Sequence, residues 1–294
     1  MSAFTATTAA PAAAPAPAAP APVLHNLSPE EIAARMQELY PEANHLTTVV
    51  VKPELTLVQL ELVLTCLKFS QYINNFDHKI REMRKIEVLG VFWFGPKIPG
   101  FITINVDAFN CETQKNEASG YVFIRGEAVA VLVRVRVAGK LYALLARQWR
   151  APGGGYMTEA IAGMMDTNQN LIGTVMKELK EESGIVLTAE QLIHLGKMYP
   201  SIGGCDELIT CFMTTIIDMD EARFAQILEQ SHGVASEGES IRIVAYLINT
   251  TAEIFALMQF QDSKINSCIL GLLKLEHEEA AKATTAAAST ITQV

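Results

Sequence analysis

The hydrophobic and polar positions change their period near residue 80. Between residues 24 and 80 apolar residues recur at helical spacing. Ser28 is followed by proline and then Glu31, which is typical of a helix start because Ser28 can cap the helix while Glu31 closes a capping box. A second helix is predicted from about Thr56 to Asn74. From Arg84 onward the period is that of strands, predicted at Arg84–Phe94, Gly100–Phe109, Gly120–Arg125, Ala128–Val137 and Lys140–Arg147.

Helices and strands alternate in the second half of the chain. A helix is predicted within Gly163–Ile185, where apolar residues form one stripe at positions Ile172, Val175, Met176 and Leu179. Further strands are expected at Leu192–Tyr199, Leu208–Ile217 and Ile241–Ile248, and helices at Asp220–Ser231, Thr251–Gln259 and Ser263–His277. Strand clusters with one central helix and a C-terminal helix predict an α+β fold with a mixed sheet.

Composition narrows the classes of function. The chain has 294 residues and a formal net charge of −9, which argues against nonspecific nucleic-acid binding through a global positive field. No apolar run approaches the length of a membrane span, so no membrane partner is expected. The cysteines are odd in number, scattered and without a CxxC pair, so they support neither a disulfide framework nor a zinc knuckle, which fits a reducing compartment. They are Cys66, Cys111, Cys205, Cys211 and Cys268.

The two ends of the chain are rich in Ala, Pro and Thr. Residues 1–23 contain no Lys or Arg, which argues against a transit peptide or a signal peptide and favours a cytoplasmic protein, with an organelle still open. Such a composition cannot bury enough apolar surface to order itself. We therefore expect disordered tails at 1–23 and 280–294.

The stretch Gly163–Ile185 carries the strongest chemical signal. Glu178, Glu181 and Glu182 fall at positions i, i+3 and i+4 of the predicted helix, so their carboxylates share one face. A plain solvated acidic face is the simplest interpretation of these acids taken alone. However, three like charges held this close together repel each other unless a cation lies among them.

The full spacing around these glutamates resembles the Nudix box, G-x5-E-x7-R-E-U-x-E-E-x-G-U, where U is a bulky apolar residue. Seven of its nine fixed positions match residues 163–185. The flanks resemble ADP-sugar and ADP-ribose diphosphatases, especially the plant-type ADP-sugar group. They do so at residues 120–132, at Gln148-Trp149-Arg150 with Glu159–Gly163, at the Gly203–Glu207 loop and at the acidic loop Glu237-Gly238-Glu239.

This resemblance implies a Nudix-type α/β/α sandwich with a mixed sheet. It assigns residues 118–279 to the catalytic domain and 24–110 to a helical and β-stranded N-terminal extension, which could mediate a homodimer. The implied activity is metal-dependent hydrolysis of the diphosphate bridge in a nucleoside diphosphate sugar of the ADP-ribose or ADP-glucose type. The implied cofactor is Mg²⁺ or Mn²⁺, whose hard charge suits oxygen ligands.

The resemblance also implies roles for single residues. Metal ligands would be Ala162 through its carbonyl, Glu178 and Glu182, with Glu181 holding or supporting a second ion and counted among the catalytic residues. Glu237 or Glu239 would act as the base or as an extra ligand. Arg150 would contact phosphate through its guanidinium fork, and Glu207 would contact the sugar side of the substrate.

Two box positions depart from the pattern, and they are a linked pair. Gln169 stands where the box has Glu, and Lys177 stands where it has Arg, so an ion pair that supports the first metal-binding glutamate is lost. We therefore expect an enzyme with reduced activity. Two alternatives stay open: a weak or inactive Nudix-fold module that binds a nucleotide or an RNA end, and a Nudix enzyme with a capped RNA or a dinucleoside polyphosphate as substrate.

Overall fold

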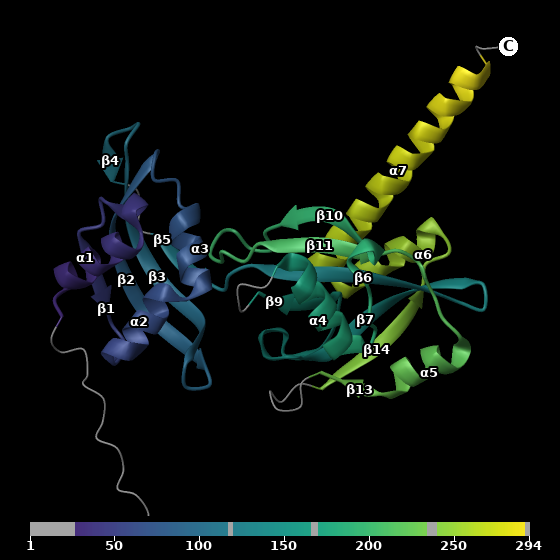
Figure 1. Ribbon diagram of the computed structural model, residues 1–294, viewed down its shortest axis with the longest axis horizontal. Coiled ribbons are helices and arrows are strands. Elements are labelled where there is room, and N and C mark those ends of the chain that lie inside the picture. Colours follow the sequence, from purple (N-terminus) through teal and green to yellow (C-terminus); the bar gives the residue numbers. More distant parts are fainter. Residues whose placement is uncertain (1–26, 117–119, 166–169, 234–239, 292–294) are drawn as a thin grey trace, which may run out of the picture.

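The computed structural model describes residues 27–116, 120–165, 170–233 and 240–291, with the backbone alone for 283–291. These residues form two lobes, each built around its own sheet (Figure 1). We call residues 27–124 the N-terminal lobe and residues 128–291 the C-terminal lobe. The expected N-terminal tail, residues 1–23, lies outside the described residues.

The N-terminal lobe packs three helices on one face of a five-stranded sheet. The strand order is β1-β2-β3-β4, and β5 also pairs with β3. The helices are α1 (Pro29–Leu39), α2 (Leu57–Thr65) and α3 (Leu67–Asn75), with the short helix η1 (Pro41–Ala43) after α1. The strands are β1 (Thr48–Val51), β2 (Arg81–Phe94), β3 (Ile98–Asn110), β4 (Lys115–Asn116) and β5 (Gly120–Ile124).

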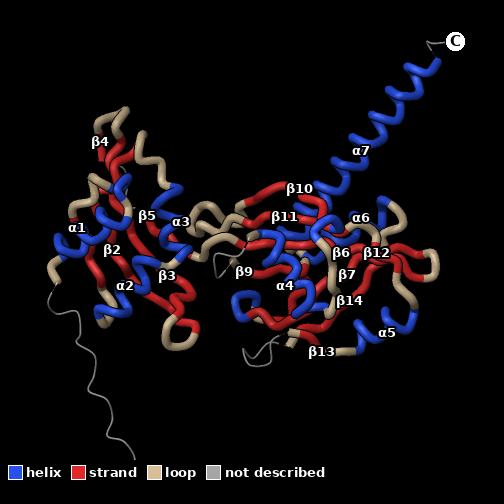
Figure 2. Tube along the Cα trace, viewed as in Figure 1, coloured by secondary structure: helices blue, strands red, loops and turns tan. Residues whose placement is uncertain are grey.

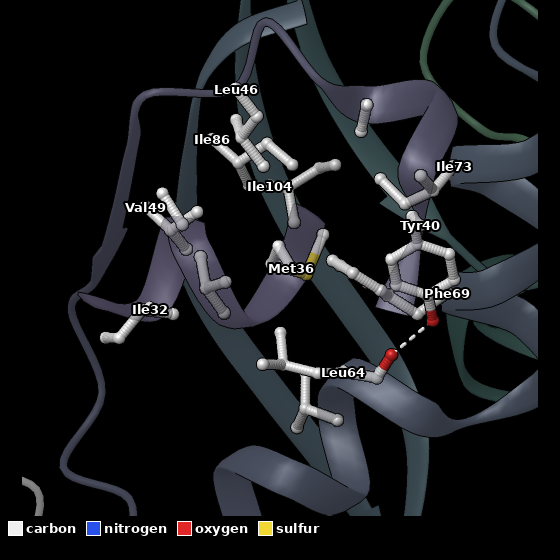
Figure 3. Packing of buried hydrophobic residues seen from close by; sticks show 14 of the residues in the cluster. Ile32, Met36, Tyr40, Leu46, Val49, Leu64, Phe69, Ile73, Ile86 and Ile104 are labelled. Carbon is white, nitrogen blue, oxygen red and sulfur yellow. Dashed lines mark hydrogen bonds between the residues drawn. The ribbon is translucent and has the colours of Figure 1, made fainter. Parts of the chain in front are cut away.

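The core of this lobe lies between the helices and the sheet (Figure 3). Met36 from α1 and Phe69 from α3 are fully buried against Ile86 and Ile104 of β2 and β3. The capping box predicted at Ser28 and Glu31 is confirmed, since Ser28 Oγ accepts the Glu31 N–H and Glu31 accepts the Ser28 N–H. The side chains that begin α1 in the sequence therefore also anchor it in the structure.

The C-terminal lobe contains nine strands and four α-helices among its described residues. The strands are β6 (Ala128–Val137), β7 (Lys140–Arg150), β8 (Gly155–Glu159), β9 (Ile161–Met164), β10 (Leu192–Met198), β11 (Ile209–Thr214), β12 (Ile217–Asp218), β13 (Ser231–His232) and β14 (Ile241–Leu247). The helices are α4 (Leu171–Ser183), α5 (Glu221–Glu229), α6 (Thr251–Ala256) and α7 (Ser263–Ile291), with short helices η2 (Ala151–Gly153), η3 (Ala189–Gln191) and η5 (Leu257–Phe260).

The sheet of this lobe is mixed and covered on both faces. Its main order is β10-β11-β6-β7-β14-β13, with β11 parallel and β7 antiparallel to the central β6. Leu144 on one face packs with α4 and α5, while Leu145 on the other packs with α6 and α7. Successive residues of a strand point to opposite faces, so the continuous apolar run in β6 fits a strand buried on both sides. The predicted α+β sandwich with a mixed sheet is thus confirmed.

Several predicted boundaries are wrong. The helix predicted from Thr56 to Asn74 is two helices, because Cys66 adopts an extended conformation between them. Strand Gly120–Ile124, expected to open the catalytic domain, pairs with β3 in the N-terminal lobe, so that lobe extends past the predicted boundary at 118. The part of the expected C-terminal tail up to Ile291 continues α7, as its high alanine content favours. Figure 2 shows this helix projecting from the lobe.

The two lobes are joined by backbone hydrogen bonds as well as by the chain itself. The Phe123 N–H in β5 donates to the Gly204 carbonyl at 2.8 Å, and the Asp206 N–H donates to the Phe123 carbonyl at 3.3 Å. Asp206 Oδ1 in turn accepts the N–H groups of Arg125 and Gly126, at 2.7 and 3.1 Å. The loop between β10 and β11 is therefore fastened to the N-terminal sheet.

None of the helices in the described part of the chain combines the length and the apolar character needed to cross a membrane.

Replacing Tyr40 by Phe should destabilise the N-terminal lobe. The buried Tyr40 hydroxyl donates to the Leu64 carbonyl near the end of α2 (Figure 3). Losing that bond leaves a buried carbonyl without this partner, at a cost of about 1–2 kcal/mol. Denaturant unfolding measures the change. Tyr121→Phe is the control, since Tyr121 is 70% exposed, and equal midpoints for both variants would contradict the assignment.

Candidate functional site

Helix α4 has a capping residue at each end. The Asn170 side chain caps the N-terminus by accepting the Gly173 N–H at 2.6 Å. Gly184 ends the helix in the left-handed conformation, with a φ of 67°, which favours glycine. Val175 and Leu179 are buried in the core beneath the helix. These constraints fix which face of α4 is turned toward the neighbouring strand β9.

Gly163 in β9 lies directly against the side chain of Glu178 in α4. A Cβ atom added to Gly163 would stand 2.0 Å from Glu178 Cδ and 2.2 Å from its Oε1, far inside any real contact. The space that a side chain at residue 163 would fill is therefore occupied by the Glu178 carboxylate. The first glycine of the sequence pattern is explained by this close approach of helix and strand.

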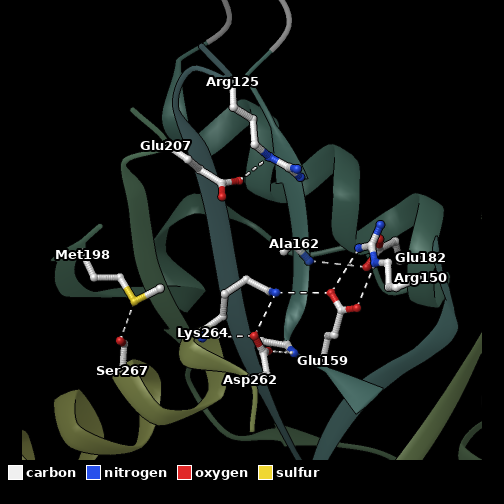
Figure 4. A network of polar contacts seen from close by, with 11 residues as sticks. Arg125, Arg150, Glu159, Ala162, Glu182, Met198, Glu207, Asp262, Lys264 and Ser267 are labelled. Atoms are coloured by element: carbon white, nitrogen blue, oxygen red, sulfur yellow. Dashed lines mark hydrogen bonds and ion pairs between the residues drawn. The ribbon is translucent and has the colours of Figure 1, made fainter. Parts of the chain in front are cut away.

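Glu182 lies one turn after Glu178 and is directed at the same strand. Its side chain is buried, and Oε2 accepts the Ala162 N–H at 3.4 Å (Figure 4). Strand β9 is held in register by β6, where Ala162 stands opposite Ala130. Glu178 and Glu182 thus meet two successive residues of β9, Gly163 and Ala162.

Glu181 is turned away from this contact. Its Oε2 lies 3.5 Å from Lys177 Nζ, and its side chain is one-third exposed. With Lys177, Lys180 and Met176 it lines a surface hollow of about 380 Å³. The helix therefore separates the three predicted glutamates into a pair directed at β9, of which Glu182 is buried and Glu178 partly buried, and a third residue turned away from that strand.

The donor atoms near β9 are chemically suited to a hard divalent cation. Carboxylates and a backbone carbonyl are the oxygen ligands that Mg²⁺ and Mn²⁺ prefer, and the gap at Gly163 gives the Glu178 carboxylate room at the strand. Within the described residues no three His, Cys, Asp or Glu side chains form a group that could hold a metal ion. The predicted Glu237 and Glu239, and Gln169, lie outside those residues.

Arg150, predicted to bind phosphate, is fixed by Glu159. Its Nε and Nη2 lie 2.8 and 3.1 Å from the two carboxylate oxygens of Glu159, a bidentate arrangement across strands β7 and β8. Glu159 is buried, whereas the Arg150 side chain is 39% exposed. The guanidinium is therefore oriented from its buried side while part of it stays accessible.

Two further charged residues, which no sequence pattern indicated, complete this cluster. Lys264 Nζ lies 3.2 Å from Glu159 Oε2 and 2.9 Å from Asp262 Oδ1 (Figure 4). Asp262 Oδ2 accepts the Ala160 N–H at 2.9 Å. We call Arg150, Glu159, Asp262 and Lys264 the charge cluster. About 100 residues separate its two halves, so no local motif could have revealed it.

Burial and pairing act in opposite directions on this cluster. Burial alone would raise the pKa of Glu159, but the hydrogen bond from Arg150 and the charge of Lys264 lower it below its ordinary value. Burial alone would lower the pKa of Lys264, but Asp262 and Glu159 raise it. Pairing therefore outweighs burial for both residues and favours the charged forms of Glu159 and Lys264.

Glu207, predicted to face the sugar, forms an ion pair at the joint between the lobes. Its Oε1 lies 2.7 Å from Arg125 Nε, and its side chain is 14% exposed. The Arg125 guanidinium stacks over Phe101, 5.3 Å from the ring centre. The neighbouring Asp206 is partly buried, and this burial raises its pKa. The structure does not bring Glu207 into contact with Glu178, Glu182 or the charge cluster.

Comparison with curated proteins found relatives that are similar to this chain in sequence. The chain is 33% identical over 190 residues to Nudix hydrolase 14, chloroplastic, of Arabidopsis thaliana, covering 60% of each. It is 25% identical over 125 residues to an ADP-ribose pyrophosphatase of Bacillus subtilis, covering 40% of this chain and 65% of that one. The chain thus spans less than two thirds of these curated relatives. No family model matches.

A solved ADP compounds hydrolase aligns with a TM-score of 0.44 and 14% identity, covering 67% of this chain and 97% of that one. The sequence matches confirm the resemblance to Nudix hydrolases that residues 163–185 indicate.

Replacing Gly163 by Ala should disable the site while leaving the fold intact. The three heavy atoms nearest to the new methyl group all belong to the flexible Glu178 side chain, which has to move away from β9. We expect Mn²⁺ affinity to fall roughly 10- to 100-fold, as when the orientation of a metal ligand is lost. Calorimetric titration with Mn²⁺ measures this.

Gly155→Ala provides the matched control for that variant, because nothing lies within 4 Å of a Cβ added at Gly155 in the nearby strand β8. Both variants should unfold close to the wild-type temperature. Unchanged Mn²⁺ affinity in Gly163→Ala would contradict the metal site.

Proposed function

The chain resembles Nudix hydrolases, and from this premise we propose that it is a metal-dependent nucleoside diphosphate sugar hydrolase. The substrate would be of the ADP-ribose or ADP-glucose type, and the products a nucleoside monophosphate and a sugar phosphate. The single observation that carries the proposal is the contact of Glu178 with Gly163, with buried Glu182 one turn away. A merely solvated acidic face would not require a strand without a side chain.

The proposed cofactor is Mg²⁺ or Mn²⁺, held by Glu178, Glu182 and the carbonyl oxygen of Ala162, with Glu181 at a second ion. When bound, such an ion neutralises phosphate charge and increases the acidity of water. The protein supplies the orientation of these ligands. Glu182 is kept beside β9 by the Ala162 N–H, and Glu178 is kept there by the space at Gly163.

Cleavage requires water to attack one phosphorus atom of the bridge while the bridging P–O bond breaks. We propose that Glu237 or Glu239 accepts the proton that this water loses. Arg150 would bind the phosphate oxygens, because its planar fork suits phosphate and Glu159 holds it in one orientation. Charge that develops on the phosphates would therefore meet a cation already in place.

The sugar side of the substrate is assigned to Glu207. The named activity of the Bacillus subtilis relative supports an ADP-ribose type of substrate. In the described structure Glu207 pairs with Arg125, so it would approach a sugar hydroxyl as a carboxylate already oriented by that pair. We further propose a homodimer, with strands of the N-terminal lobe between Arg84 and Phe109 at the interface.

Hydrolysis should be detected by incubating the protein with a panel of nucleotide sugars and Mg²⁺ or Mn²⁺. AMP and sugar phosphate are the expected products from at least one ADP-linked member. Glu182→Gln should reduce kcat by at least roughly 100-fold, since it removes a proposed ligand and its charge. Glu229→Gln, at an exposed position in α5, is the control and should keep full activity.

A folded protein that forms no product from any member would overturn the enzyme proposal. If nucleotides still raised its unfolding temperature, the alternative of a non-catalytic binding module would hold instead. Undiminished turnover in Glu182→Gln would place the activity elsewhere in the molecule.

Replacing Gln169 and Lys177 by the residues of the Nudix box should raise the hydrolytic activity. Lys177 lies 3.5 Å from Glu181 and is half exposed, so its charge is engaged at the surface of α4. The double change Gln169→Glu with Lys177→Arg supplies an acid and a planar fork that can pair. We expect kcat/KM to rise roughly 10- to 100-fold. Lys180→Arg, on the exposed side of the same helix, should change nothing, and an unchanged double variant would show that the pair is irrelevant here.

A further inference from the structure

We propose that Lys264, at the start of α7, is a positioning residue that orients Arg150 for phosphate binding through Glu159. The inference rests on the proposed function, because it deepens the role of Arg150 there. It begins from the charge cluster, where one carboxylate is shared by two cations that come from distant parts of the chain.

The hydrogen bonds that Glu159 accepts indicate how Lys264 acts on Arg150. Glu159 Oε1 receives Arg150 Nε, whereas Oε2 receives both Arg150 Nη2 and Lys264 Nζ. The ammonium group therefore fixes the plane of the Glu159 carboxylate, and that plane in turn fixes the plane of the guanidinium. Because the Lys264 side chain is only 16% exposed and that of Glu159 only 9%, water competes little for these contacts.

Asp262 connects Lys264 to the backbone just before strand β9. One of its oxygens holds Lys264 Nζ, and the other holds the Ala160 N–H, two residues before Ala162. The side chain thus bridges the first turn of α7 and the segment that leads from β8 into β9. Asp262 and Lys264 thus position both β9, the strand of the proposed metal ligands, and Arg150, the proposed phosphate ligand.

Charge balance explains why the lysine is needed. With Lys264 present, two cations face two carboxylates. Without it, Arg150 would be the single cation of the charge cluster, and Asp262 would be a buried charge without its ion pair. The excess negative charge of the cluster would weaken the attraction of Arg150 for a phosphate. The effect should therefore appear mainly in ligand affinity, and so in KM more than in kcat.

The test uses the full chain with Lys264→Met, Lys264→Arg and the control Lys274→Met. Lys274 lies on the same helix, and its side chain is 72% exposed. The ligand is the methylene-bridged analogue of ADP-ribose, whose P–C–P bridge water cannot cleave, with Mg²⁺ present. We expect Lys264→Met to raise its Kd roughly tenfold. Lys264→Arg should recover most of this loss, and Lys274→Met should change nothing.

A double-mutant cycle separates positioning from general damage. If Lys264 acts through Arg150, Lys264→Met should have little further effect on Kd once Arg150 is replaced by Met. A full tenfold effect in that background would overturn the proposal. So would an unchanged Kd in Lys264→Met alone.

A readout that needs no ligand keeps the inference separate from the proposed function. The Nε–H resonance of Arg150, assigned by its loss in Arg150→Lys, should shift in Lys264→Met and remain in place in Lys274→Met. No shift would overturn the positioning role whatever the substrate is. A shift combined with no binding of the analogue by the wild-type protein would support the positioning of Arg150 and count against the proposed substrate.

Discussion

The close approach of helix α4 to strand β9 at Gly163 is the constraint on which the candidate site depends. No side chain stands between the helix and the strand there, so Glu178 reaches the backbone of β9. Glu182 follows one turn later and accepts the Ala162 N–H. The caps at Asn170 and Gly184 set the ends of the helix, and its buried face sets the rotation. A small shift in any of these would move both carboxylates together.

The charge cluster holds the charged side chains near the candidate site in fixed positions. Buried ions are costly unless they are paired and hydrogen bonded. Here each of the two carboxylates has a cation within 3.2 Å, and the Ala160 N–H provides a further bond to Asp262. The resulting network links strand β7, strand β8 and the first turn of α7. Through these contacts the first turn of α7 is linked to Arg150 and to the segment that leads into β9.

Local patterns in the sequence predicted most of the longer helices and strands, and they placed Glu178 and Glu182 on one face of one helix. The capping residue Ser28, the alternation in β2 and β3, and the spacing from Gly163 to Ile185 each depend on neighbours along the chain. The charge cluster depends on Lys264 and Glu159 meeting across 105 residues, which no local pattern encodes. The short strands β8 and β9 were missed because sheet pairing, more than propensity, determines them.

Strand β5 gives the two lobes a shared boundary. It completes the N-terminal sheet through β3, while Phe123 in the same strand pairs with the loop that carries Glu207. A cut at residue 118 would leave this strand without its sheet and would remove the support of that loop. The two lobes are consequently not independent modules, because removing strand β5 from the N-terminal sheet would also remove the hydrogen-bond partners of the Gly203–Glu207 loop.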